Sequence, residues 1–104
     1  MKINEIAIKL DAALIAGGNP EADISSVYAG DFLSRVMGKA PAGCVWLTVM
    51  ANVNVAGVVV MADIGAVVLC EGVQPDKILA DKCAVEGIAL LTTKKSVYEC
   101  CKLL

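Results

Sequence analysis

Two stretches decide the fold: residues 44–49 read Cys-Val-Trp-Leu-Thr-Val, and residues 66–70 read Ala-Val-Val-Leu-Cys. Both are apolar almost throughout instead of alternating with polar residues, as is typical of strands covered on both faces. A third such run covers residues 88–91, and helical segments over residues 53–62 and 75–86 separate the three. This alternation predicts an α/β fold: a mostly parallel sheet of about four to five strands, with helices on both faces and right-handed crossovers.

The segment 75–86 has the start and stop signals of an amphipathic helix. Pro75 suits the first turn, and Gly87 suits the C-terminal end. Its charged residues fall on one side of the expected helix. The side chains expected to face the core are Ile78, Leu79, Ala80 and Cys83.

The segment 53–62 is rich in valine, which favours strands. A helix is still expected, because a parallel pair needs a crossover of about a dozen residues and a hairpin at Ala56-Gly57 would lack Asn or Asp. A helix that is apolar nearly all round needs cover on every side, and we expect a second copy of the chain to supply part of it. The sequence therefore predicts a homodimer, with interface residues Val55, Val58, Val59 and Ala62.

The N-terminal part is less regular. Residues 4–14 show helical spacing, with Asn4 as the expected cap, and the short apolar run 13–15 can form a strand. Gly17-Gly18-Asn19-Pro20 predicts a turn, and residues 24–29 predict another strand.

Residues 96–104 predict a closing helix that is capped by Ser96. The chain of 104 residues is expected to form one domain, residues 1–104. Within it, residues 1–23 form an N-terminal helix and turn, and residues 24–104 form the α/β core.

Hydrophobic residues make up 58% of the chain, which raises the question of a membrane span. The longest uncharged stretch lies between Lys39 and Asp63. It does not read as one apolar helix, because it contains polar and turn-forming residues: Pro41, Gly43, Asn52, Asn54 and Gly57. The first ten residues contain Glu5 and Lys9 and no secretory apolar region, so a cytoplasmic protein that does not contact membranes is expected.

Composition excludes several classes of function. The chain has no histidine, which removes the commonest general base and the commonest metal ligand. Its basic residues are scattered apart from Lys94-Lys95, so nucleic-acid binding is not expected. There is no phosphate-binding loop, no GxGxxG sequence and no nucleophile elbow. No enzymatic activity, catalytic residue, cofactor or metal is therefore predicted.

The five cysteines form no CxxC pair and no zinc-binding spacing. Cys44 and Cys70 lie in expected strands and are interpreted as packing residues. Cys100 and Cys101 are adjacent on the expected last helix, so at most one of them faces inward. The other would be exposed and open to oxidation.

Ligands of open parallel sheets bind beyond the carboxyl ends of the strands, where the loops converge. Helix N-termini point free amides at the same edge, so a small anion could be held there. The candidate ligand-binding residues in these loops are Asp31, Thr48, Asn52, Asn54, Glu71, Gly72, Thr92 and Thr93.

Structural roles are also open to several of these residues. Asp31 could be a helix N-cap, and Asn52 and Asn54 could cap the valine-rich helix. Glu71 could simply end a strand, and Lys94-Lys95 could be a solvated loop. In each case the structural role is the commoner one, and Asp31 with Glu71 is no catalytic pair unless the two are close.

Several short strings along most of the chain resemble the DRTGG domain family. The strings that carry the resemblance are Tyr28-Ala29-Gly30-Asp31-Phe32-Leu33, Pro41-Ala42-Gly43-Cys44-Val45-Trp46-Leu47-Thr48, Leu69-Cys70-Glu71-Gly72-Val73-Gln74-Pro75-Asp76, Gly87-Ile88-Ala89-Leu90-Leu91-Thr92-Thr93 and Ser96-Val97-Tyr98-Glu99. The chain is also similar to the N-terminal domain of HPr kinase/phosphorylase. The resemblance implies an α/β fold, dimerisation and a regulatory or scaffolding role, and it implies no kinase activity, because the kinase chemistry of that protein resides in a separate domain with a phosphate-binding loop.

The motif that names the family is mostly replaced. Where the family has an Asp-Arg pair and a Thr-Gly-Gly triplet, this chain has Ala51-Asn52 and Cys70-Glu71-Gly72, so only Gly72 remains. An arginine is lost and a carboxylate is gained, which argues against a phosphate-type ligand in these two loops.

Two functions follow. The first is a non-catalytic regulatory or scaffolding module that homodimerises and engages a protein partner. The alternative is a sensor of a small metabolite, possibly a nucleotide, which binds at the strand-end loops.

Overall fold

The computed structural model describes all 104 residues, and it contains five helices and five strands. In chain order these are α1 (Ile3–Leu10), β1 (Ala13–Ala16), β2 (Val27–Ala29), α2 (Leu33–Lys39), β3 (Val45–Thr48), α3 (Asn54–Ala62), β4 (Ala66–Leu69), α4 (Lys77–Glu86), β5 (Leu90–Thr92) and α5 (Val97–Leu103). None of these helices is long and apolar enough to cross a membrane.

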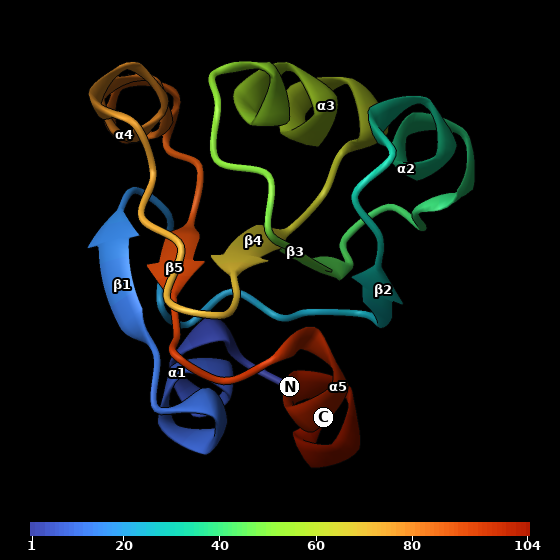
Figure 1. The fold of residues 1–104 in the computed structure, drawn as a ribbon, viewed down its shortest axis with the longest axis vertical. Coiled ribbons are helices and arrows are strands. Elements are labelled where there is room, and N and C mark those ends of the chain that lie inside the picture. Colours follow the sequence, from blue (N-terminus) through green and yellow to red (C-terminus); the bar gives the residue numbers. More distant parts are fainter.

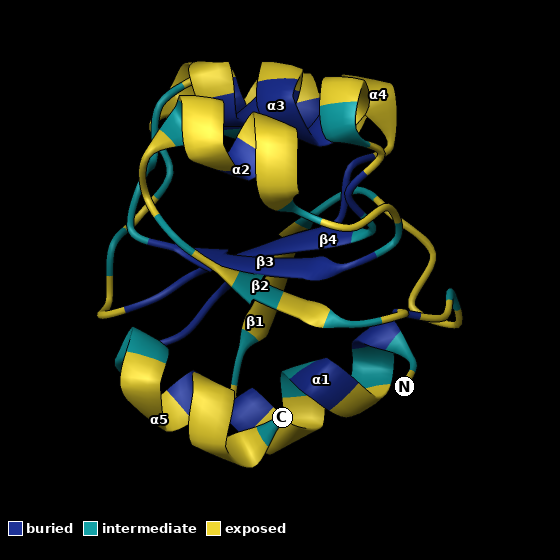
Figure 2. Ribbon diagram, turned by 90° about the vertical axis from the view of Figure 1, so that its right-hand side faces the viewer, coloured by how far each residue is buried: buried dark blue, intermediate teal, exposed yellow.

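The five strands form one sheet in the order β1-β5-β4-β3-β2. Strands β2 to β5 are parallel to their neighbours, and β1 pairs with β5 in the antiparallel direction. Helices α2, α3 and α4 cover one face of the sheet, and α1 and α5 cover the other (Figures 1 and 2). The predicted mostly parallel sheet with helices on both faces is confirmed. Because β1 belongs to the sheet, the N-terminal segment is part of the same core.

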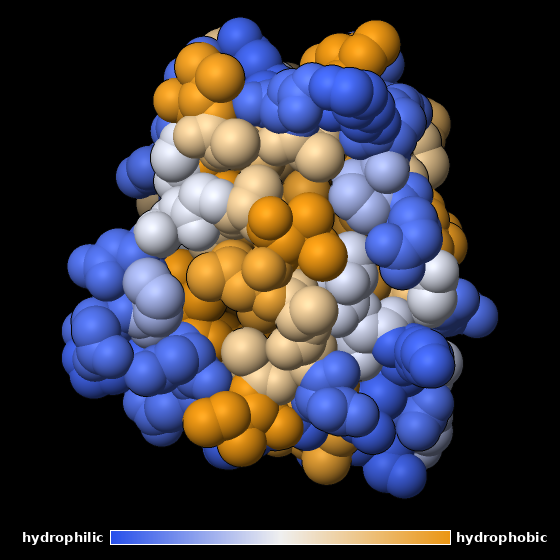
Figure 3. All heavy atoms as spheres, turned by 90° about the vertical axis from the view of Figure 1, so that its left-hand side faces the viewer, coloured by the Kyte–Doolittle hydropathy of each residue, from blue (hydrophilic) through white to orange (hydrophobic).

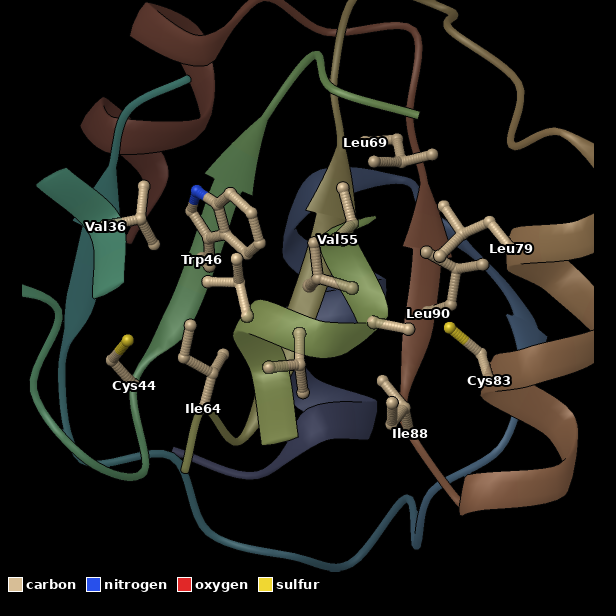
Figure 4. Close-up of a cluster of buried hydrophobic side chains, with 14 residues drawn as sticks. Val36, Cys44, Trp46, Val55, Ile64, Leu69, Leu79, Cys83, Ile88 and Leu90 are labelled. Atoms are coloured by element: carbon tan, nitrogen blue, oxygen red, sulfur yellow. The ribbon is translucent and has the colours of Figure 1, made fainter. Parts of the chain in front are cut away.

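The two central strands are buried on both faces, as their sequences indicate. Every residue of β3 and β4 is buried. Trp46 and Leu69 point toward α2, α3 and α4, in a cluster that also contains Val36 and Leu79 (Figure 4). The intervening residues of the same strands pack against α1 and α5 on the opposite face: Val45, Leu47, Ala66 and Val68.

The segment 53–62 is a helix, as predicted, but its predicted role as an interface is wrong in its residues. Val55, Val58 and Val59 are at most 4% exposed within a single chain, and Ala62 is half-buried. The chain's own sheet and helices provide the cover, so these side chains are not available to a second copy. The exposed apolar residues of this region are Val53, Val60 and Met61.

Three expectations about helix ends are corrected. Asn4 does not cap α1; it lies inside the helix, and its side-chain amide donates to Glu21 Oε1 at 3.0 Å. Helix α4 begins at Lys77 and is capped by Asp76, whose carboxylate accepts from Leu79 N at 2.8 Å. Pro75 therefore precedes the helix instead of occupying its first turn.

Two further predictions from the sequence concern side chains of α4 and α5. Ile78 was expected in the core, but it is 66% exposed because it falls on the outer side of α4. The capping role of Ser96 is confirmed. Its hydroxyl accepts from Glu99 N, and Glu99 Oε1 accepts from Ser96 N, each at 3.1 Å. These contacts hold the pKa of the Glu99 carboxyl below its ordinary value.

Four cysteines are buried, and Cys101 is exposed. Cys70 and Cys100 lie with their sulfurs 3.9 Å apart inside the layer that α5 covers. Burial, together with the neighbouring thiol, raises the pKa of Cys70 to about 12. This thiol stays protonated near neutral pH, which makes it a packing residue, as the sequence indicated for Cys70.

Candidate functional site

The carboxyl ends of the parallel strands meet at one edge of the sheet, but their polar side chains divide into two separate groups. The first group lies at the ends of β2 and β3, and we call it the Asp31 cluster: Asp31, Thr48, Asn52 and Asn54. The second lies at the ends of β4 and β5, and it contains the other predicted residues: Glu71, Gly72, Thr92 and Thr93.

The Asp31 cluster is occupied by its own hydrogen bonds. The Asp31 carboxylate accepts from Thr48 Oγ1 at 2.7 Å and from Val49 N at 3.0 Å. Thr48 Oγ1 in turn accepts from Met50 N at 3.2 Å, and Thr48 is fully buried. Asp31 is therefore not the N-cap of α2, a place taken by Phe32. Instead, it ties the end of β2 to the end of β3.

Asn52 also has a structural role. Its side-chain oxygen accepts from Asn54 N at 2.9 Å, which satisfies a free amide at the first residue of α3. The N-cap position itself is Val53, so Asn52 supports the start of α3 from one residue before the cap. Asn54 is itself exposed on the first turn of the helix.

The second group surrounds a hollow of about 280 Å³, which we call the β4–β5 hollow. It lies where the loops after β4 and β5 meet the turn between α1 and β1. The residues that line it are Asp11, Ala13, Gly72, Gln74, Thr92, Thr93, Lys94 and Lys95. Gly72, Thr92 and Thr93 are predicted site residues that the structure brings together.

Backbone hydrogen bonds join the two loops of the hollow, the one after β4 and the one after β5. Glu71 N donates to Lys95 O at 2.8 Å, and Gly72 N donates to Thr93 O at 2.9 Å. Both Glu71 and Gly72 have positive φ, 62° and 74°, a conformation that glycine adopts without strain. The Glu71 side chain is exposed and does not line the hollow. The carboxylate that argued against an anionic ligand therefore lies outside it.

The Thr93 side chain is committed to the fold. Its hydroxyl donates to Leu10 O at 2.7 Å and accepts from Lys95 N at 3.3 Å. The first contact satisfies a carbonyl at the end of α1 and so attaches α1 to the β5 loop. Thr93 thus shapes the hollow, but its hydroxyl has little hydrogen-bonding capacity left for a ligand.

The other polar side chains of the hollow are uncommitted. Asp11, Gln74, Lys94 and Lys95 form no side-chain hydrogen bond or ion pair within the chain. Two lysines and one carboxylate leave an excess of one positive charge. Gln74 adds an amide that can donate and accept. The hollow therefore offers donors and positive charge to a small anion.

Sequence reasoning missed Asp11 and Gln74 as site residues and interpreted Lys94-Lys95 as a solvated loop. Asp11 could not be found, because its position depends on the antiparallel pairing that places Ala13 beside Thr92. A usable signal did exist for Lys94 and Lys95, because they directly follow the carboxyl end of a buried strand.

A second concave surface lies in the layer of α2, α3 and α4, between α2 and α3. We call it the α2–α3 groove, and its volume is about 710 Å³. The residues that line it are Leu33, Ser34, Met37, Val53, Asn54, Ala56, Gly57, Val58, Met61 and Lys82. Most of these are apolar, so the groove suits an apolar surface better than a charged metabolite.

No family model and no curated protein matches the sequence. Among solved structures, the chain is similar to the CBS and DRTGG domains of the regulatory region of Clostridium perfringens pyrophosphatase, complexed with its activator diadenosine tetraphosphate. The TM-score is 0.78 at 12% sequence identity. The two share a fold. The match covers 98% of this chain and 45% of that chain, so this protein spans about half the length of the region it resembles.

We expect replacement of Asp31 to affect stability and not ligand binding. Asp31→Ala leaves the buried Thr48 hydroxyl without its acceptor, which should lower the free energy of unfolding by about 1–3 kcal/mol. Asp31→Asn keeps an acceptor and should cost less. Urea denaturation of the two variants measures the difference. Equal stability of Asp31→Ala and the wild type would show that the Asp31 cluster does not hold the strand ends together.

Proposed function

We propose that this chain is a non-catalytic regulatory domain that binds a small anionic metabolite in the β4–β5 hollow. The observation that carries the proposal is the convergence of uncommitted groups, since Lys94, Lys95 and Gln74 line one concave site and have no partner in the chain. Asp11 is the one carboxylate there, so the site has no pair of carboxylates for acid–base catalysis. Binding without turnover is the function that these groups support best.

A phosphorylated metabolite, with nucleotides first, is the ligand class we favour. Lysine ammonium groups bind phosphate oxygens, and Asp11 can accept from a hydroxyl or an amino group on the same molecule. The activator named for the similar regulatory region is a nucleotide, which supports the same class. The hollow is small for a ligand pocket, so a mononucleotide suits it better than a larger molecule.

A regulatory domain also needs a means to pass on its signal, and we propose that this chain acts as a homodimer and engages a protein partner. The α2–α3 groove favours an amphipathic helix of that partner, because Met37, Val53 and Met61 offer an adaptable apolar surface. Arg35 and Lys39 on α2 form no ion pair, so acidic residues beside the apolar ones would complement them.

We expect AMP, ADP or ATP to raise the melting temperature, whereas adenosine, which lacks phosphate, should not. The double variant Lys94→Ala, Lys95→Ala should weaken binding at least about ten-fold, because it removes charge-assisted hydrogen bonds to phosphate. Thermal shift and calorimetric titration measure both effects.

The matched control is Arg35→Ala, Lys39→Ala, which removes the same charge from α2, and Asn52→Ala tests the other strand-end loop. Neither should change binding. Loss of binding in either control, or a flat response to every phosphorylated compound, would contradict the proposed ligand site.

For the protein partner, we expect site-specific photo-cross-linking in cells from position 37 or 61 to trap one protein with an amphipathic acidic helix. The same cross-linker at Tyr98, which is 70% exposed on α5, is the control. The groove would be excluded as the binding surface if positions 37 and 61 trapped nothing, or trapped only what position 98 traps.

A further inference from the structure

Strand β1 leaves one edge of the sheet open. It pairs with β5 on one side, and the strand order leaves its other side without a partner. Its sequence, Ala-Leu-Ile-Ala, contains no charged residue and no proline. Charged residues and proline usually protect an open edge strand from pairing with other chains. The one irregularity is the shift in register between Leu14 and Ala16. We call this the β1 edge.

The apolar surface at this edge extends beyond the strand onto both helical layers. Figure 3 shows a hydrophobic band that runs over α4, β1 and α1. The exposed apolar residues of these three elements are Ile8, Leu14, Ile15, Ile78 and Val85. Ile8 and Val85 are each at least 80% exposed, one on each side of the sheet. An extended peptide could cover β1, but it would leave both of these side chains in water.

The charged side chains around the β1 edge differ in sign between its two ends. At the beginning of the strand, Ala13 lines the same hollow as Lys94 and Lys95, and the last turn of α1 adds Lys9. The contact of Thr93 Oγ1 with Leu10 O places the end of α1 at this end of the strand.

The other end of the β1 edge carries carboxylates. Gly17, just after β1, lies against the backbone oxygens of Cys83 and Ile88, which places the last turn of α4 with Glu86 there. Glu5 lies in the first turn of α1, and Glu21 contacts the same turn through Asn4. Lys82 pairs with Glu86 and Lys2 pairs with Glu21 at this end, and Asp11 lies beside the lysines at the other. The three glutamates outnumber these two lysines, and Lys9, Lys94 and Lys95 outnumber Asp11, so one end of the edge has a net negative charge and the other a net positive charge.

We infer that a second copy of this chain docks on the β1 edge, with its β1 antiparallel to the first about a two-fold axis perpendicular to the sheet. This arrangement joins two five-stranded sheets into one and sets α1 beside α1 and α4 beside α4 of the other copy. It also sets the lysine end of each edge against the glutamate end of the other, so the charge pattern is self-complementary.

This inference rests on the homodimer of the proposed function and names the surface that forms it. Because Ala13, the first residue of β1, lines the β4–β5 hollow, the second copy would lie next to the proposed ligand site.

Sedimentation velocity of the full chain tests the inference. The wild type should sediment as twice its mass of 10.8 kDa. Ile15→Lys places a charge in the strand, and Ile8→Glu and Val85→Glu place charges on the two helices that flank it. Each should raise the dimer dissociation constant at least about ten-fold, because a charge would have to be desolvated on docking. Circular dichroism checks that each variant is folded, and the two helix variants alter side chains that a single chain does not bury.

Val60→Glu is the matched control, because Val60 is 58% exposed on α3, away from the β1 edge and outside the lining of the α2–α3 groove, and this variant should remain dimeric. Glu5→Lys and Lys9→Glu should each weaken the dimer, and an equal mixture of the two proteins should restore it as a heterodimer. A monomeric wild type would overturn both this inference and the proposed homodimer. A dimer that survives all three edge variants would overturn this inference alone.

Discussion

The burial of β3 and β4 on both faces is the constraint on which the rest of the structure depends. Every residue of the two strands is buried, and Thr48 is the one polar side chain among them. Such strands are stable only with helices on both faces, and parallel neighbours require a helical crossover between them. Polar groups are therefore confined largely to the strand ends, because an unpaired polar group in the core would cost free energy.

The polar residues at the carboxyl edge differ in whether the fold already uses them. Asp31, Thr48 and Asn52 satisfy backbone or hydroxyl groups of neighbouring segments and so hold the strand ends and the start of α3. The side chains of Lys94 and Gln74 form no hydrogen bond or ion pair within the chain, and they belong to the proposed ligand site. The polar groups that hold the fold are thus separate, along one edge of the sheet, from those of the proposed ligand site.

Much of the fold could be predicted from the sequence, because continuous apolar runs and helix-end residues such as Gly87 act locally. The exposure of Ile78 and the cover over Val55 could not, since they depend on how helices rotate and pack against the sheet. Part of the candidate site was predictable, because Thr92 ends a buried strand and Gly72 lies in the loop after another. Asp11 was not, because its place in the site follows from a strand pairing between distant segments.

The most direct test of the division between the Asp31 cluster and the β4–β5 hollow is a titration of ¹⁵N-labelled protein with AMP, in which the amide chemical shifts are measured. We expect the largest changes at Gly72 and at Thr92–Lys95, with the amides of Val49, Met50 and Asn54 nearly unmoved, because the Asp31 cluster is already satisfied by internal hydrogen bonds. Changes centred on Val49 to Asn54, with the β4–β5 hollow unmoved, would contradict the assignment of the ligand site.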